Sequence, residues 1–360
     1  MSDAFALPAY IARFKAARTP SELAVRFAEA DDALTPHEYL ALGDLLAEIL
    51  PEVLPHYRNR QVTKHITARN AQPYARHPLG PHVLKFADSS VPDDRKTLLV
   101  AFTGLKPRLM LPNLVLLQTL PAELFDLVIC YDPGHDHFVA GTVDYADSFP
   151  DLVRRLNADL RPDRYRRHVA IGTSMGGLPA IRYGLLGGVE EVVAISAATP
   201  WHINRLKVGR PTEAFDPLCA CMAGRTPPTL AVFSALNRTD SKVAYWLGEH
   251  FGARLRPIPD EAGHNPLSAM WRDGRLPGLL GELLHFTPDT DPVASEPARP
   301  QETPKPKPQE KPAVEASPKR MATVKDRPAP SAFVRFWRRL ARRIGLASKP
   351  ARKPPRSDAT

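Results

Sequence analysis

Short apolar runs alternate along the chain with longer segments of helical periodicity. The runs that predict core strands are residues 97–102, 127–130, 169–171, 191–195 and 229–234, and residues 253–258 predict a short strand with one polar side. Two further runs, 61–66 and 82–86, predict strands that lead into this series. Because strands that alternate with helices build a mostly parallel sheet with helices on both faces, the pattern predicts an α/β fold.

The N-terminal part of the chain, residues 1–60, has a helical pattern. Thr19-Pro-Ser-Glu22 and Thr35-Pro-His-Glu38 both have the proline and the acidic residue that are typical of a first helical turn. The leucines that follow position 38 form an apolar face. We therefore expect a small helical segment that packs on the core or caps its mouth, followed by one domain over residues 61–286.

The composition changes after residue 286. Residues 287–330 contain many prolines and few apolar side chains, which predicts a disordered linker. Residues 331–346 place arginines away from a stripe of apolar side chains, which predicts a basic amphipathic helix, and 347–360 predict a disordered basic end. The stripe consists of Phe333, Phe336, Trp337, Leu340 and Ile344.

The net charge of +9 resides almost entirely in the last thirty residues, which hold nine Lys and Arg against one Asp. A basic helix with an aromatic face predicts binding to an anionic membrane surface or to a protein groove, and a helix that folds back on its own core is the alternative. Nucleic acid is not expected as a partner, because an aromatic apolar face has no role there.

No run of 18 apolar residues and no signal-peptide pattern is present, and the three cysteines have no zinc spacing. These features predict a cytoplasmic protein, peripherally bound to membrane if the basic helix binds lipid. His135-Asp136-His137 lacks a third ligand in view, so we expect a solvated loop or a pocket wall there. Neither a metal nor a cofactor is expected.

The most informative local pattern lies in residues 168–184. A short apolar run enters Gly172-Thr-Ser-Met-Gly176, and an apolar helical pattern leaves it. This arrangement predicts a tight strand-to-helix turn with Ser174 at its tip, where the helix dipole favours negative charge. The alternative is an ordinary glycine-rich turn with a capping serine. A nucleophilic serine requires a carboxylate and a histidine later in the chain.

Both partners are present in the required order. Asp240 follows the predicted strand 229–234 and precedes a helical pattern, so it is the candidate carboxylate, with a helix N-cap as the alternative role. His264 lies on a loop directly after the last predicted strand, 253–258, and is the candidate base. The alternative for His264 is a loop histidine without a task.

A tetrahedral oxyanion requires backbone N–H donors beside the serine. The N–H of Met175, directly after Ser174, is one candidate. The strand 97–102 runs into Thr103-Gly104, and an N–H of Thr103 or Gly104 is the second candidate. An ordinary strand-end turn is the alternative.

Residues 61–286 resemble the α/β-hydrolase superfamily of serine esterases, lipases and thioesterases. The resemblance rests on Gly172-Thr-Ser-Met-Gly176, Asp240 and Gly263-His264. The resemblance implies a Ser174–His264–Asp240 triad that cleaves a carboxylic ester through an acyl-enzyme. An acyltransferase with the same triad, or a non-catalytic recruiting scaffold, is the alternative.

Many members of this superfamily carry a His-Gly pair in the loop that supplies the second oxyanion donor, where this chain has Thr103-Gly104. The substrate class, a small-molecule, lipid or glycan ester, and the oligomeric state are therefore left open. The interval before strand 229–234 leaves room for a small lid helix over 213–223, with Trp201 and His202 facing the pocket.

Overall fold

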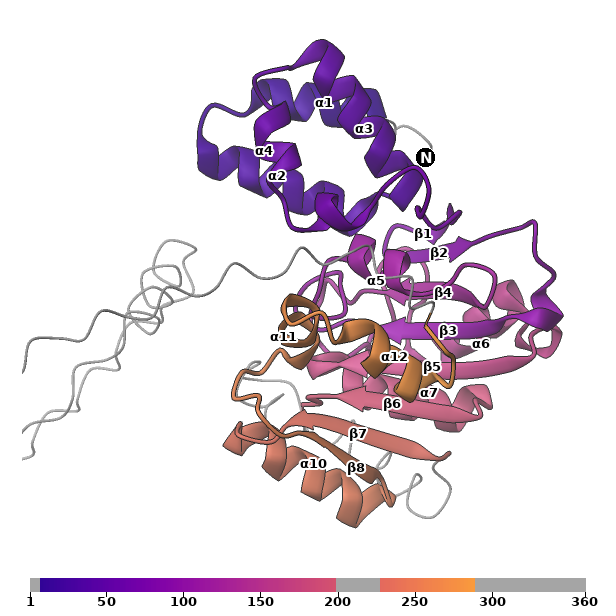
Figure 1. Cartoon of the computed structure of the whole chain (residues 1–360). Helices are drawn as coiled ribbons and strands as arrows, with labels where there is room; N and C mark the ends of the chain where they lie inside the picture. Colours follow the sequence, from indigo (N-terminus) through magenta and orange to yellow (C-terminus); the bar gives the residue numbers. More distant parts are fainter. Residues whose placement is uncertain (1–6, 199–226, 289–360) are drawn as a thin grey trace, which may run out of the picture. The chain divides into compact units, whose positions relative to one another are not determined.

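The computed structural model describes residues 7–198 and 227–288 of the 360-residue chain. Its strands form one sheet in the order β1-β2-β4-β3-β5-β6-β7-β8 (Figure 1). Strand β2 pairs antiparallel with β1 and β4, and the remaining neighbours are parallel. The strands are β1 (Ala75–Gly80), β2 (Val83–Ala87), β3 (Thr97–Phe102), β4 (Phe125–Cys130), β5 (Arg167–Thr173), β6 (Glu191–Ile195), β7 (Thr229–Ser234) and β8 (Arg254–Ile258).

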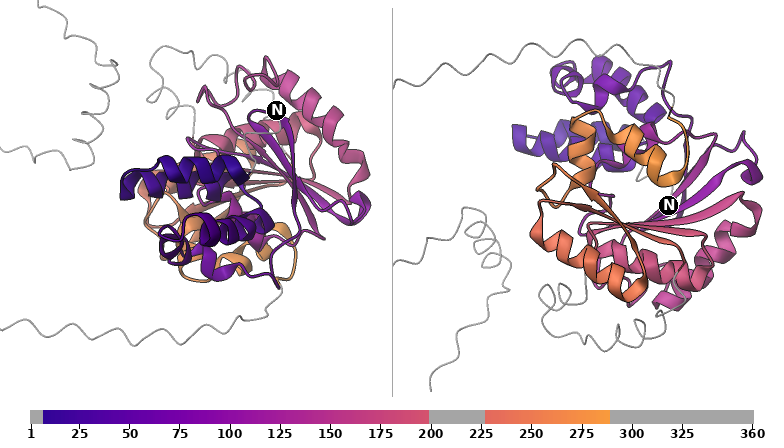
Figure 2. Two further views of the ribbon diagram at one scale, coloured as in Figure 1. Left: turned by 90° about the horizontal axis from the view of Figure 1, so that it is seen from above. Right: turned by 60° about the horizontal axis from the view of Figure 1, so that its bottom comes forward.

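Helices cover both faces of the sheet, and each face has its own apolar core. Strands β3, β4 and β7 are buried at every residue, as expected for strands that are covered on both sides. Figure 2 (right) shows the helices of the two faces separated by the sheet. One face carries α6 (Phe149–Leu160), α7 (Gly177–Gly187) and α10 (Arg238–Phe251), and the other carries α5 (Asn113–Thr119), α11 (Pro266–Arg272) and α12 (Leu276–Leu284). The predicted α/β architecture is confirmed.

The N-terminal helices pack into the core on the sheet face that carries α5, α11 and α12. Apolar side chains of all four helices are buried in the same cluster as α5 and α12. The predicted starts are present: Thr19 caps α2, and Thr35 forms a capping box with Glu38. The helices are α1 (Leu7–Ala16), α2 (Pro20–Ala33), α3 (Pro36–Ile49) and α4 (Leu54–Arg58). This segment therefore contributes to the main core.

One predicted strand is wrong. Residues 61–66 do not pair with the sheet, and Val62–His65 forms a single turn of 3-10 helix. The edge strand is instead β1, whose polar and proline-containing sequence gave no strand signal. A proline is tolerated there because an edge strand leaves one row of N–H groups unpaired, and Pro257 in the opposite edge strand β8 follows the same rule.

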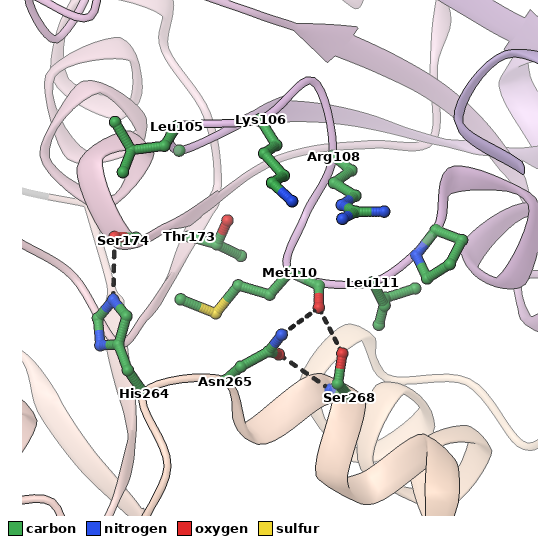
Figure 3. Close-up of a pocket in the computed structure, with 12 residues that line it drawn as sticks. Leu105, Lys106, Arg108, Met110, Leu111, Thr173, Ser174, His264, Asn265 and Ser268 are labelled. Atoms are coloured by element: carbon green, nitrogen blue, oxygen red, sulfur yellow. Dashed lines mark hydrogen bonds between the residues drawn. The ribbon is translucent and has the colours of Figure 1, made fainter. Parts of the chain in front are cut away.

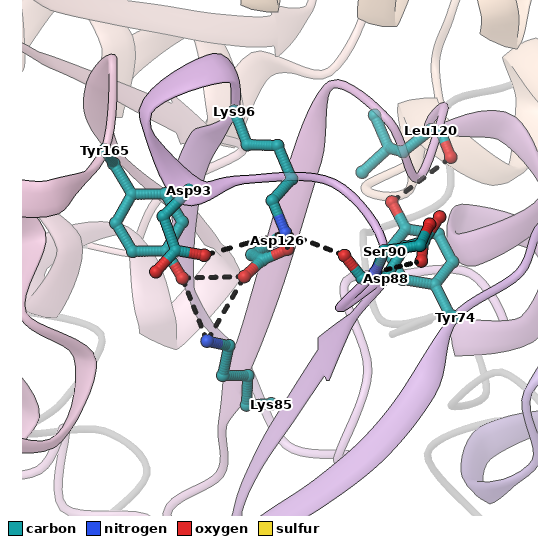
Figure 4. A network of polar contacts seen from close by, with 9 residues as sticks. All are labelled: Tyr74, Lys85, Asp88, Ser90, Asp93, Lys96, Leu120, Asp126 and Tyr165. Atoms are coloured by element: carbon teal, nitrogen blue, oxygen red, sulfur yellow. Dashed lines mark hydrogen bonds and ion pairs between the residues drawn. The ribbon is translucent and has the colours of Figure 1, made fainter.

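A buried carboxylate lies at the start of β4, under the antiparallel end of the sheet. Asp126 is fully buried, and its oxygens accept hydrogen bonds from Lys96 Nζ at 2.6 Å and from the Tyr165 hydroxyl at 2.6 Å (Figure 4). Lys85 Nζ adds an ion pair at 3.2 Å. These partners connect β2 and the segments before β3 and β5 to β4, and they compensate a charge that would be costly if it were buried alone.

Several predictions fall outside the described residues. They are the lid helix over 213–223 with Trp201 and His202, almost all of the linker 287–330, the basic helix 331–346, and the end segment 347–360. Among the residues that are described, no helix is both long and apolar enough to cross a membrane.

Candidate active site

Ser174 stands at the tip of a tight turn between β5 and α7. Its φ of 53° lies in the left-handed region, which a non-glycine residue adopts only under local constraint. Thr173 and Met175 on either side are buried, whereas Ser174 is partly exposed. A Cβ at Gly172 would stand 2.6 Å from the carbonyl carbon of Gly176, so the turn closes only with glycine there.

The structure brings the three predicted side chains into one line of hydrogen bonds. His264 Nε2 is 3.0 Å from Ser174 Oγ, and His264 Nδ1 is 2.8 Å from Asp240 Oδ1. The Asp240 side chain is 2% exposed and the His264 side chain 52% exposed, so the carboxylate is shielded while the imidazole faces the opening. The segments that follow β5, β7 and β8 supply these residues at the carboxyl ends of the parallel strands, with Asp240 in the first turn of α10.

The alternative role of Asp240 as a helix cap does not apply. Asn237 is the N-cap of α10, and its side chain accepts hydrogen bonds from the N–H groups of Thr239 and Asp240. Asp240 therefore lies in the first turn, where its backbone is fixed by the cap and its carboxylate points to His264.

Thr103 and Gly104, the two candidates for the second oxyanion donor, differ in their backbone hydrogen bonding. The N–H of Thr103 donates to the Cys130 carbonyl at 3.0 Å, so it is committed to the sheet, and this half of the sequence prediction is wrong. Gly104 lies beside the turn, because a Cβ built on it would be 3.3 Å from Ser174 Cβ and 3.8 Å from Met175 N. The candidate donors therefore narrow to Met175 and Gly104.

The His135–His137 loop lies behind the turn and does not line the pocket. His137 is 1% exposed, and its Nδ1 is 2.9 Å from the Met175 carbonyl oxygen. The expectation of a solvated loop or pocket wall is therefore wrong for His137, because the loop folds under the serine turn. Within the described residues, no group of three or more metal-ligating side chains is present.

A cavity of about 370 Å³ opens beside Ser174 and His264. Most of its wall comes from the loop between β3 and α5, which also supplies two cationic side chains, Lys106 and Arg108 (Figure 3). Sequence reasoning did not single out these two residues. The signal was available, since Lys-Pro-Arg follows Gly104 almost directly, but charges on a loop are usually solvated.

The pocket wall is held across the fold by hydrogen bonds to one carbonyl. Met110 O accepts from Asn265 Nδ2 and from Ser268 Oγ, both at 2.6 Å. Asn265 directly follows His264 and caps α11 through the N–H of Ser268. These hydrogen bonds tie the loop after β3 to the segment that follows His264.

No protein-family model and no curated protein sequence matches the chain. Among solved structures, it is similar to Est1E from Butyrivibrio proteoclasticus, with 12% identity and a TM-score of 0.42 over 59% of this chain and 99% of that one. It is also similar to a hormone-sensitive lipase from a metagenome library (16%, 0.43, over 69% and 97%) and to a Pyrobaculum calidifontis esterase (12%, 0.43, over 62% and 87%).

The strand order and the placement of the site define the class of fold. A mostly parallel sheet with an antiparallel β2, a serine turn after β5, an acidic residue after β7 and a histidine after β8 together constitute the α/β-hydrolase fold. This fold supports several chemistries, so the reaction has to be argued from the site.

Proposed function

We propose that this protein is a serine hydrolase that cleaves a carboxylic ester or a related acyl bond. The observation that carries the proposal is the hydrogen-bonded series from Asp240 through His264 to Ser174, on a left-handed serine that faces a cavity. The contact between Ser174 Oγ and His264 Nε2 has the length that proton transfer from a nucleophile to its base requires, and the contact with Asp240 orients the imidazole.

In the proposed reaction, His264 Nε2 takes the hydroxyl proton of Ser174 as Oγ attacks the carbonyl carbon of the substrate. Nδ1–H of His264 donates to Asp240, which fixes the tautomer and stabilises the imidazolium that forms. The imidazolium then gives the proton to the leaving alcohol, and water attacks the acyl-enzyme with the same histidine as base.

The negative charge of the tetrahedral intermediate is assigned to the N–H groups of Met175 and Gly104. Each such donor is worth about 2.7–4 kcal/mol of transition-state stabilisation. Gly104 suits this role because it has no side chain between its backbone and Ser174, with Ser174 Cβ only 3.3 Å from the position that a Cβ would take.

The test is labelling by a fluorophosphonate probe together with turnover of short p-nitrophenyl esters and thioesters. We expect the wild-type protein to be labelled and active, and Ser174→Ala to lose both. The matched control is Ser89→Ala, an exposed serine in the loop after β2, which should keep both. Full ester turnover by Ser174→Ala would exclude the proposal.

Two alternatives make different predictions in the same assays. An acyltransferase would form an acylated acceptor in preference to the free acid when an alcohol or a sugar is added, which product analysis detects. A non-catalytic scaffold would leave Ser174 unlabelled. The continuity of the hydrogen bonds from Asp240 to Ser174 favours a catalytic site over a scaffold.

For the basic segment 331–346, the proposal rests on sequence alone. We propose that it binds an anionic membrane surface through its arginines and aromatic stripe. Deleting residues 331–360 should release the protein from vesicles that contain phosphatidylserine and leave ester turnover in solution unchanged. Vesicle binding that survives the deletion would exclude this role.

A further inference from the structure

The pocket beside Ser174 is cationic. Lys106 and Arg108 extend from the loop after β3 into the space that Ser174 and His264 border (Figure 3). None of the twelve described residues that line this cavity is acidic. The two charges therefore give the described wall of the pocket a positive potential on one side of the nucleophile.

The Lys106 charge is uncompensated within the described part of the chain. Lys106 is exposed, and its ammonium group forms no ion pair or hydrogen bond with the described residues. A surface lysine without a partner is common, but here its loop borders the reacting serine through Gly104. A ligand at Ser174 would thus sit within the field of this ammonium group.

Arg108 is positioned rather than freely solvated. Its Nη1 lies 3.4 Å from Asp32 Oδ1, and the two side chains are 23% and 18% exposed. The loop is also held at Pro107, because Asn113 Nδ2 donates both to the Pro107 carbonyl at 2.9 Å and to the Asp32 carbonyl at 2.8 Å. The ion pair engages one terminal nitrogen of a guanidinium that has further N–H donors for a second oxyanion.

We infer that the preferred substrates of this site are esters that carry an oxyanionic group, a carboxylate or a phosphate, which binds to Lys106 and Arg108. The inference rests on the proposed hydrolase function and names its substrate class. The guanidinium offers paired N–H donors to such a group, and the ammonium adds a point charge. A neutral ester of the same length would leave the Lys106 ammonium without a partner and the remaining N–H donors of Arg108 unused.

The experiment compares matched esters by the ratio of their kcat/KM values, in which a general loss of activity cancels. One arm uses p-nitrophenyl hemiglutarate against p-nitrophenyl pentanoate, which places a carboxylate on the acyl side. The other uses 4-acetoxyphenyl phosphate against phenyl acetate, which places a phosphate on the alcohol side. We expect at least one anionic ester to be preferred by about tenfold or more at low salt.

The variants assign this preference to the two cations. Lys106→Gln and Arg108→Gln should each reduce the ratio about tenfold, and high salt should reduce it in the wild-type protein. Lys64→Gln, an exposed lysine on the turn Val62–His65, removes the same charge outside the pocket and should keep the wild-type ratio. Because Arg108→Gln also breaks the contact with Asp32, its melting temperature is measured alongside.

Failure of the inference and failure of the proposed function give different results. Normal turnover of neutral esters with a ratio near one in both arms, or a ratio that Lys106→Gln and Arg108→Gln leave unchanged, would overturn the inference alone. Calorimetry on Ser174→Ala adds a readout without catalysis. Suppose that no ester is hydrolysed, but Ser174→Ala binds the hemiglutarate and the double variant with Lys106→Gln does not. The hydrolase function then fails and the anion site stands. If Ser174→Ala also fails to bind the hemiglutarate, both are overturned.

Discussion

The close approach of the serine turn to the loop after β3 makes Gly176→Ala a sensitive perturbation. A Cβ at Gly176 would stand 2.5 Å from the carbonyl carbon of Phe102 and 2.7 Å from the carbonyl oxygen of Thr103. Carbon atoms in contact need about 3.5 Å, so the two backbones must separate by about 1 Å. Neither neighbour is a flexible side chain that could turn away, because both contacts are with main-chain atoms of β3 and its following loop.

The displaced segment is the one that leads directly into Gly104, a proposed oxyanion donor. A misplacement of about 1 Å in a catalytic constellation can reduce the rate about 100-fold. Overpacking of a filled site typically costs about 1–3 kcal/mol of stability. We therefore expect Gly176→Ala to lose about two orders of magnitude in kcat/KM on a p-nitrophenyl ester and to unfold at lower urea concentration.

Gly278→Ala is the matched control, because the same methyl group is added where no atom beyond the adjacent helix backbone lies within 4 Å. Gly278 is inside α12, where alanine is the better helix former by up to about 1 kcal/mol. This variant should keep wild-type activity and equal or exceed wild-type stability. If Gly176→Ala matched the wild type in both measurements, the close packing of the serine turn against the loop would not constrain the site.

Three further changes test other parts of the fold. Asp126→Ala leaves the Lys96 charge buried without its carboxylate and should lower the free energy of unfolding in urea by about 3–5 kcal/mol. The control is Glu282→Gln, which removes an exposed ion-pair partner. An equally small loss in both variants would contradict the role of the buried network. Burial lowers the pKa of His168 from 6.5 to about 4. The unfolded chain therefore binds this proton at higher pH than the folded protein does. About 3 kcal/mol of stability, fully present above pH 6.5, is lost as the pH falls towards 4. Urea titrations of His168→Gln should therefore show a flatter pH dependence than those of the wild type. Asn237→Ala removes the cap that fixes the backbone of Asp240 and should cost about 1 kcal/mol and lower kcat; an unchanged kcat would show that the cap does not position the carboxylate.

Much of the fold was predictable because the signals were local. Strands β3 and β7 of the parallel part are mostly apolar runs, and the starts of α2 and α3 follow from Thr19 and Thr35. The strand β1 was missed because edge strands are half solvated and need no apolar pattern. The apolar residues of 61–66 suggested a strand, but Val62 and Ile66 are buried in the core shared with the N-terminal helices without pairing with the sheet.

The sequence by itself determined the serine turn, the order of serine, aspartate and histidine, and the strands that carry them, because each depends on residues close together in the chain. Only the tertiary structure decided what depends on long-range contacts. It placed His264 within hydrogen-bonding distance of Ser174, committed the Thr103 N–H to Cys130, and turned Lys106 into the pocket. Hydrogen-bond commitments and the charge of a cavity are set by neighbours remote in sequence, so no local pattern records them.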